Sequence, residues 1–228
     1  MSIRARRIAQ THKILGLVIG LQLFFWTASG LFFTLFPIEQ IRGEHLRAET
    51  PAIDPAGLGN ITPPDVEYPF EKAELRQVLD RPVWEVSGNG RTRLYEASTG
   101  EKIAPLEEAD VRRVAEEGWA GRGYATTVER IDNPPREAFS TRPLWRVEFE
   151  GLDRAVFWVD AETARIVAVR TTKWRIFDVF WRFHIMDITG DDRFDSWWLK
   201  IAAFLGLSTV LFGIALLVHR AMRGRLVK

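Results

Sequence analysis

The sequence predicts an α+β domain held between two transmembrane α-helices, and three observations support this prediction. Residues 14–36 and 196–218 are apolar and long enough to cross a bilayer core of ~30 Å at ~1.5 Å per residue. The polar chain between them contains a hairpin pattern that occurs twice. The immediate outer flanks of the apolar segments are basic, which favours a cytoplasmic location for both chain ends.

Each apolar segment is expected to be a membrane anchor. No charged residue occurs between Ile14 and Phe36, and the second segment contains only Lys200, near its start, where a lysine can snorkel. The first segment is too long for the apolar region of a signal peptide, and the residues around Pro37 are a poor cleavage site. We therefore expect an uncleaved anchor that ends at Pro37.

The charges beside the anchors predict the topology. The outer flanks carry Arg4, Arg6, Arg7 and Lys13 before the first anchor, and Arg220, Arg223, Arg225 and Lys228 after the second. The inner flanks mix acidic and basic residues. Residues 1–13 and 219–228 are therefore expected in the cytoplasm, and the middle on the far side, which in a bacterium is the periplasm. The net charge of +1 gives no indication of a nucleic-acid partner.

The repeated pattern is a tryptophan-bearing strand, a turn, a returning strand and a second turn. It begins at Arg81-Pro82-Val83-Trp84-Glu85-Val86 and again at Arg142-Pro143-Leu144-Trp145-Arg146-Val147. Ala164 occupies the place in the second copy that Gly100 occupies in the first. If that turn requires a positive φ, the second copy is either strained or uses another turn type.

We expect the two copies, about residues 69–104 and 105–171, to form one α+β domain. Each copy would open with a helix, at 70–79 and 107–119, because both segments have helical periodicity. Strands are expected at 83–87, 91–96, 144–150, 155–160 and 165–170, with an extra strand at 126–131 and a short one at 102–103. Short alternating strands need a cover, so both helices should pack on one side of an antiparallel sheet.

Two segments join this domain to the anchors. Residues 37–68 should form a short interfacial helix over 38–45 and then a linker rich in Pro and Gly. Residues 172–195 begin with an aromatic amphipathic helix that is expected to lie along the outer membrane surface. Asp191, Asp192 and Asp195 follow, and they either suit the N-terminus of the second anchor helix or bind a cation.

Both anchors carry a face of small residues. In the first anchor this face includes Gly16, Gly20 and Gly30, and in the second it includes Gly206 and Gly213. Small faces let helices approach closely, within one chain, across a homodimer or in a larger membrane complex. The alternative is that such a face receives a flat cofactor.

No catalytic set can be assembled from the sequence. The chain has no cysteine, which excludes disulfides, thiolate metal sites and covalently attached haem c. The four histidines do not have zinc-site spacing, and no serine stands in a nucleophile motif. We therefore expect no enzymatic activity from this chain on its own.

Three motifs resemble those of the PepSY-associated membrane proteins. They are His12-Lys13-Ile14-Leu15-Gly16-Leu17 at the start of the first anchor, the doubled Trp-containing hairpin, and Phe183-His184 before the last anchor. The resemblance covers nearly the whole chain and implies a periplasmic PepSY-like domain. Larger relatives are associated with iron–siderophore uptake, and some are haem-containing reductases whose haems are held by histidines of the spans. Isolated PepSY domains are discussed as peptidase inhibitors. This chain has only two spans, which puts a complete transmembrane electron path in doubt.

The histidines are the candidate ligands for a b-type haem. His12 and His219 lie at the cytoplasmic ends of the two anchors, although His219 points away from the small face of its helix. A second chain could supply the partner of His12 instead. His184 and His45 lie on the outer side and form a second candidate pair. The alternative for each of them is an interfacial residue near the lipid headgroups.

Two functions remain open from the sequence. One is an accessory protein in iron, siderophore or haem-related membrane processes, with a periplasmic domain that binds a peptide, a peptidase or another protein. The other is a haem-binding redox component of the membrane. We expect the first, because no reacting group has a clear partner in the sequence.

Overall fold

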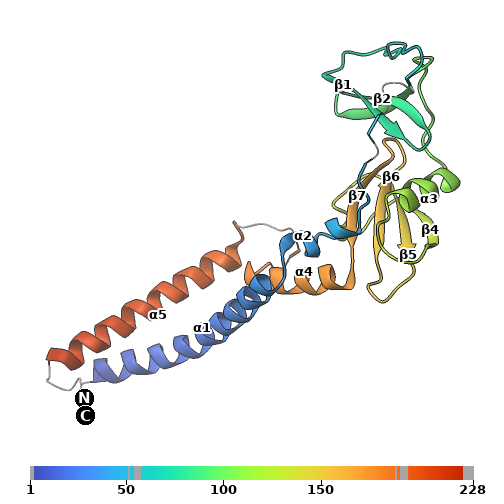
Figure 1. Ribbon diagram of the computed structural model, residues 1–228. Helices are drawn as coiled ribbons and strands as arrows, with labels where there is room; N and C mark the ends of the chain where they lie inside the picture. The colour runs from blue at the N-terminus through green and yellow to red at the C-terminus, as the bar shows by residue number, and fades with distance from the viewer. Residues whose placement is uncertain (1–2, 51, 54–57, 188, 191–194, 223–228) are drawn as a thin grey trace. The chain divides into compact units, whose positions relative to one another are not determined.

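The computed structural model describes residues 3–50, 52–53, 58–187, 189–190 and 195–222. The chain divides into two compact units. The helical unit contains Met1–Pro37 and Ile176–Lys228, and the sheet unit contains Ile38–Arg175. Both long helices belong to the helical unit, and the strands belong to the sheet unit (Figure 1).

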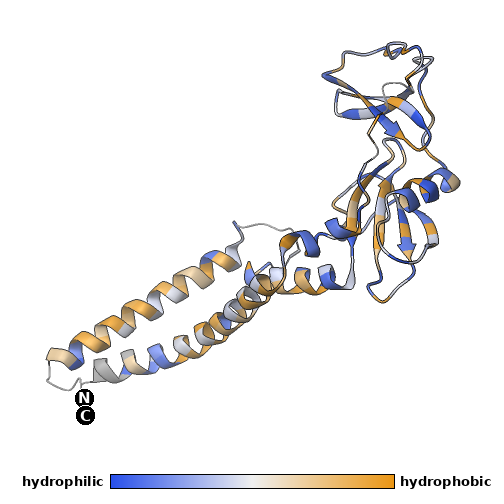
Figure 2. Ribbon diagram, in the orientation of Figure 1, coloured by the Kyte–Doolittle hydropathy of each residue, from blue (hydrophilic) through white to orange (hydrophobic). Residues whose placement is uncertain are grey.

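The helical unit contains both expected anchors. Helix α1 spans Ile3–Leu35 and helix α5 spans Trp197–Met222. Ala9–Leu35 and Trp197–Met222 are long and apolar enough to cross a membrane, and apolar residues predominate over most of both helices, with hydrophilic residues near the start of α1 (Figure 2). Gly213 near the end of α5 lies beside His12 near the start of α1, so the two helices run antiparallel.

Only one of the five anchor glycines lies in close contact with a neighbouring helix among the described residues. A Cβ atom built on Gly213 would lie 3.3 Å from Cε1 of His12. A Cβ atom on Gly16, Gly20, Gly30 or Gly206 would meet nothing within 4 Å. Packing of this face against a second chain therefore stays a prediction.

Helix α4, Thr172–His184, packs its aromatic side chains against α1. Phe180 stacks on Phe32 at 4.8 Å between ring centroids, and Phe177 lies 4.8 Å from Phe33. Further along, Phe183 stacks on Phe25 at 5.5 Å, so this part of α4 runs antiparallel to α1. The sequence pattern had indicated a face turned to the membrane surface. In the folded chain the neighbouring helix covers much of that face.

The first sheet contains strands β1 Lys72–Val78, β2 Arg81–Gly88 and β3 Arg91–Glu96, in that order. The helix expected at 70–79 is wrong, because these residues form β1. Leu75 pairs with Trp84, and the two-residue turn at Leu79 and Asp80 joins the strands. Pairing with β2 therefore outweighs the helix-favouring composition of the segment.

The second sheet follows the expected order closely. Helix α3, Glu108–Glu117, precedes strands β4 Ala125–Ile131, β5 Leu144–Phe149, β6 Val156–Asp160 and β7 Arg165–Arg170. All four strands pair antiparallel with their sequence neighbours. The extra strand at 126–131 is confirmed as β4, whereas the strand expected at 102–103 is only a bridge between Tyr95 and Lys102.

One core joins the two sheets. Val83 and Leu94 of the first sheet share a buried cluster with Val111 of α3 and with Val147 and Phe157 of the second sheet. With β1 in place of the first predicted helix, α3 is the helix that packs near β4, β5 and β6. The sheet unit is therefore α+β, as expected, but with one covering helix where two were expected.

The described part of the expected linker also lies on this unit. It begins with helix α2, Ile38–Ile41, and the 3-10 helix η1, Glu44–Leu46. Another 3-10 helix, η3, spans Arg136–Ala138 between β4 and β5. Leu46 joins the core, and Ala48 donates its N–H to the Gly118 carbonyl. The Thr62 N–H bonds to the Ala97 carbonyl, and Trp84 Nε1 donates to the Thr62 carbonyl at 2.9 Å.

Gly100 and Ala164, which occupy equivalent turn positions in the two copies, both have a positive φ. Gly100 has a φ of 77° and Ala164 has a φ of 52°. The second copy therefore keeps the left-handed turn and accepts a Cβ atom in it, which costs roughly 1–2 kcal/mol. Of the two alternatives, the strained turn is the one observed.

Candidate functional site

The sheet unit and the helical unit each contain a candidate site. In the sheet unit, several charged side chains pair with one another and stabilise the fold. Glu85 of β2 is buried and accepts bonds from Nε of Arg76, at 2.7 Å, and from Nε of Arg165, at 3.0 and 2.9 Å. Arg76 also donates to the Thr163 carbonyl.

The Glu85 cluster joins one sheet to the other, because Arg76 and Glu85 belong to the first sheet and Arg165 to the second. Arg93 and Glu162 form a further ion pair between the sheets. Burial lowers the pKa of Arg76, whereas the bond to Glu85 raises the pKa of Arg165. Both oxygens of the Glu85 carboxylate accept hydrogen bonds from arginine side chains, so we assign Glu85 a structural role.

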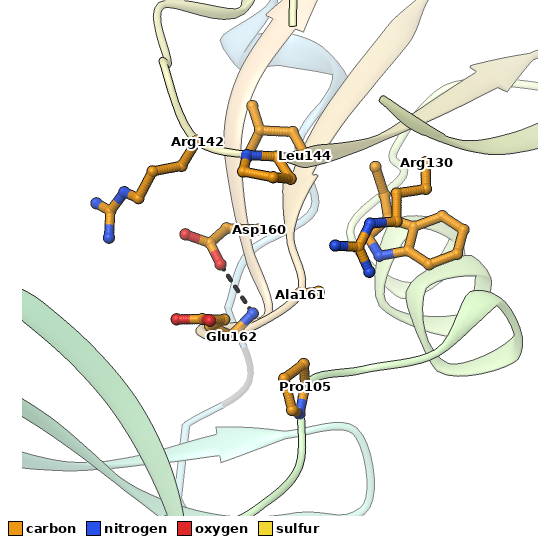
Figure 3. Close-up of a pocket in the computed structure, with 9 residues that line it drawn as sticks. Pro105, Arg130, Arg142, Leu144, Asp160, Ala161 and Glu162 are labelled. Carbon is orange, nitrogen blue, oxygen red and sulfur yellow. Dashed lines mark hydrogen bonds between the residues drawn. The ribbon is translucent and has the colours of Figure 1, made fainter. Parts of the chain in front are cut away.

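A small pocket opens at one end of the second sheet (Figure 3). Its volume is about 160 Å³. Its walls come from β4, β5, the β6–β7 turn and the loop before α3, namely Pro105, Arg130, Arg142, Pro143, Leu144, Trp145, Asp160, Ala161 and Glu162. This volume is smaller than a site for a drug-sized ligand, and suits one side chain.

The carboxylate of Asp160 forms one wall of this pocket and organises the β6–β7 turn. Its Oδ1 accepts the N–H group of Glu162 at 2.8 Å (Figure 3). It also accepts the N–H group of Thr163, at 3.3 Å. Burial raises the pKa of Asp160, against the lowering effects of the Thr163 N–H bond and of Arg142 and Arg93. An acidic wall beside Arg130 and Arg142 gives the pocket both signs of charge.

The pocket lies beside a sheet edge that carries no neighbouring strand in the described chain. β4 is the outer strand of the second sheet, and it contributes Arg130 to the pocket. By contrast, the edge strand β3 is partly covered by Lys102 and Ile103. At the other edge, β7 bonds to Arg47 through the Ile166 carbonyl. β4 also accepts a side-chain bond, from Arg112 to the Ala125 carbonyl at 2.7 Å, at the end of the strand away from Arg130. The rest of the exposed β4 edge and the pocket together form a site that an extended segment could occupy.

In the helical unit, His184 contacts one buried hydroxyl and three aromatic rings. Its Nδ1 lies 2.9 Å from Oγ of Ser29, which is fully buried. The Ser29 hydroxyl lies 2.7 Å from the Phe25 carbonyl, which it can bond as a donor, and this leaves its oxygen to accept the His184 Nδ1–H. The other nitrogen, Nε2, then carries the free lone pair. The rings of Trp26, Phe33 and Trp181 surround the imidazole.

The two inner histidines are placed differently from each other. His12 is half-buried against Gly213, and its Nδ1 is buried without a hydrogen-bond partner. His219 is exposed and lies six residues beyond Gly213, which is about 9 Å along a helix axis. The structure gives no contact between the two imidazoles in the described chain, so their shared ligation stays a prediction.

His45 is exposed in η1 and belongs to the sheet unit, whereas His184 belongs to the helical unit. Pairing of these two histidines stays a prediction. Asp191 and Asp192 lie outside the described residues. The described residues contain no group of three or more His, Cys, Asp or Glu side chains that could hold a metal ion.

Comparison with known proteins does not extend the assignment: no family model, no curated protein and no solved structure matches this chain. The assignment of both candidate sites therefore depends on their geometry. Sequence reasoning missed Ser29 and the Asp160 pocket. A serine on an apolar helix carries no signal until its partner is known, and the pocket needs β4 beside the β6–β7 turn.

Proposed function

We propose that the chain is a two-pass protein of the bacterial inner membrane, with both termini cytoplasmic and the sheet unit in the periplasm. The two long apolar helices support the spans, and the basic outer flanks support the orientation. In this topology the sheet unit is the part that meets periplasmic partners.

The function that the geometry supports best is that of an accessory interaction protein, with no enzymatic activity of its own. One observation carries this proposal: the outer edge of β4 is unpaired in the described chain and lies beside a pocket that fits one side chain. An extended peptide or protein segment can add to such an edge through main-chain hydrogen bonds and place one side chain in the pocket. The link to iron, siderophore or haem-related processes is supported by the motif resemblance alone.

Site-specific photo-crosslinking in cells tests this proposal. A photoreactive residue at Arg130, beside the pocket, should give a discrete adduct with a protein of iron or haem uptake. The same residue at Arg91, an exposed position of the other sheet, serves as the control. Ala161→Trp should fill the pocket and abolish the Arg130 adduct. An adduct that survives Ala161→Trp, or equal adducts at Arg91, would contradict the proposal.

A second function is favoured by the His184–Ser29 bond. Histidines that ligate metals usually donate their second ring N–H to a fixed acceptor, and Ser29 is such an acceptor. His184 therefore fits a b-type haem as a ligand through Nε2. His12 lies 17 residues before Ser29 on the same helix, about 25 Å along its axis, so it would be a ligand of a separate, inner haem, within the chain or across a homodimer. Bound haem would supply one-electron transfer near the bilayer.

Absorption spectroscopy separates the two functions. A haem protein purified in detergent should show a Soret band that His184→Ala reduces, that Ser29→Ala reduces less, and that the His12→Ala, His184→Ala double variant abolishes. An accessory protein should be colourless, and its partner crosslink should survive replacement of all four histidines. A Soret band of unchanged intensity in the His184→Ala variant would exclude His184 as a ligand.

A further inference from the structure

One end of the second sheet presents large apolar side chains to the surroundings. Leu152, at the tip of the β5–β6 hairpin, is 100% exposed, Phe139 is 65% exposed and Tyr124 is 63% exposed. We call these three residues the apolar rim. None of them belongs to the buried core of the described chain, so folding of the sheet unit does not explain them.

Hydrogen bonds hold the members of the apolar rim at the same end of the sheet. The Glu150 N–H bonds to the Tyr124 carbonyl at 3.0 Å, which places Tyr124 beside the β5–β6 hairpin. The Thr172 N–H bonds to the Asp153 carbonyl at 2.8 Å, which fixes the hairpin tip to the first turn of α4.

Phe139 is held close to the same helical turn. Its ring lies 6.3 Å from that of Trp174, and the Arg170 guanidinium lies over both rings at 5.0 and 4.2 Å. Arg175 pairs with Glu137 of η3 and donates to the Arg154 carbonyl of the hairpin at 3.3 Å. These contacts fix the backbone beside Tyr124 and Leu152 and the ring of Phe139 at one end of the sheet.

The place at which the chain leaves the sheet unit indicates what covers the apolar rim. Arg175 is the last residue of the sheet unit, and the next residue, Ile176, begins the helical unit that contains both spans. The rim is thus fixed to the point at which the chain enters the membrane-spanning unit. Exposed aromatic and aliphatic side chains beside arginines are the composition of a protein surface in the headgroup region of a bilayer.

We propose that the apolar rim inserts into the outer headgroup region of the bilayer that the protein's own helices cross. Leu152 enters the apolar boundary, and the rings of Tyr124 and Phe139 lie at the headgroup level. The acidic residues Glu150 and Asp153 stand beside the arginines, so the contact depends on apolar insertion and not on anionic lipid. This inference rests on the proposed membrane insertion and adds a second, peripheral lipid contact to it.

The absence of cysteine from the chain allows a direct test. Leu152→Cys in the full-length protein is labelled with an environment-sensitive fluorophore and reconstituted in phosphatidylcholine nanodiscs. Some of the lipid carries a doxyl quencher near the top of its acyl chain. We expect a blue-shifted emission and strong quenching at Leu152→Cys. Asn89→Cys, in the exposed turn of the other sheet, should show neither effect.

The remaining outcomes each decide against the proposal. A solvent-like, unquenched label at Leu152→Cys would overturn it. A blue-shifted but unquenched label would show that a protein, or a second copy of this chain, covers the rim instead. Leu207→Cys, on the exposed surface of α5, is the control for insertion and must be quenched by a deep acyl-chain doxyl lipid. Failure at Leu207→Cys would contradict the two-pass topology itself, whereas failure at Leu152→Cys alone would contradict only the rim.

Discussion

The buried carboxylate of Glu85 pairs with Arg76 of its own sheet and with Arg165 of the second sheet, and so adds a polar link to the core that the sheets share. Removing one partner from a buried ion cluster leaves the remaining charges without compensation. We expect Glu85→Ala to lower the free energy of unfolding of the sheet unit by about 3 kcal/mol.

Chemical denaturation of the detergent-purified protein, followed by tryptophan fluorescence, measures this loss. Glu74→Ala removes a nearby but exposed carboxylate that lies 3.8 Å from Arg165, and it should have a much smaller effect. Equal effects of the two substitutions would show that Glu85 has no special role.

The glycine of the first repeat is required for two reasons. Gly100 has a φ of 77°, and a Cβ atom built on it would overlap the Pro63 carbonyl oxygen. Gly90 has a similar φ of 69°, but a Cβ atom there would meet nothing within 4 Å. We expect Gly90→Ala to cost about 1 kcal/mol and Gly100→Ala at least twice as much, in a thermal unfolding measurement. Equal costs would mean that segment 62–65 does not pack against this turn.

The Asp160 carboxyl makes the stability of the sheet unit depend on pH. Burial raises its pKa above the ordinary value of 3.8, so the folded state holds this proton more tightly than the unfolded state does. Its contribution to stability is present below that value and is lost as the pH rises through the raised pKa. Asp160→Asn keeps a side-chain oxygen for the Glu162 and Thr163 N–H groups but does not titrate.

We therefore expect the stability of Asp160→Asn to increase relative to that of the unaltered protein as the pH rises from 3.8 toward neutrality. Urea denaturation at a series of pH values measures this difference. A difference that is constant across this range would show that the Asp160 pKa is not raised.

At the scale of elements, the seam between α1 and α4 is built from stacked rings such as Phe32 and Phe180. The cysteine-free chain allows this seam to be tested by a short thiol crosslinker. We expect a Phe32→Cys, Phe180→Cys double variant to crosslink in detergent and in nanodiscs, as judged by gel mobility after proteolysis between the helices. The Phe24→Cys, Phe180→Cys pair is the control, since Phe24 is 64% exposed. Equal crosslinking of both pairs would contradict the seam.

The elements also show where sequence reasoning succeeds and fails. Strong local signals, such as Gly88-Asn89-Gly90 and the apolar length of the anchors, led to correct predictions of the β2–β3 hairpin and of both long helices. β1 was mistaken for a helix because Glu, Lys, Ala and Leu favour helices, and because its turn at Leu79 has a positive φ without Gly or Asn. That strand exists because Leu75 and Val78 pair across to β2, a contact that no local pattern reveals.

The candidate sites could be predicted only in part. His184 was identified from the sequence, but the hydrogen bond at its Nδ1 is made with Ser29, which lies 155 residues away. The pocket beside β4 combines residues from four separate segments, so it appears only after folding. For the same reason, the apolar rim is invisible in the sequence, where Tyr124, Phe139 and Leu152 are unremarkable single residues.

At the scale of the whole molecule, the function depends on which side of the membrane the sheet unit occupies. If the sheet unit is periplasmic, the β4 edge and its pocket face periplasmic partners, and the cytoplasm contains only the two short ends. If the orientation is reversed, neither a periplasmic interaction module nor an outer lipid contact is tenable.

The most direct test is thiol labelling of single-cysteine variants in a bacterial host, with a maleimide that does not cross the inner membrane. Asn89→Cys marks the sheet unit, and Arg220→Cys marks the end of α5; both positions are exposed. We predict that Asn89→Cys is labelled in intact cells and that Arg220→Cys is labelled only after the inner membrane is permeabilised. Labelling of Arg220→Cys in intact cells, with protection of Asn89→Cys, would contradict the account.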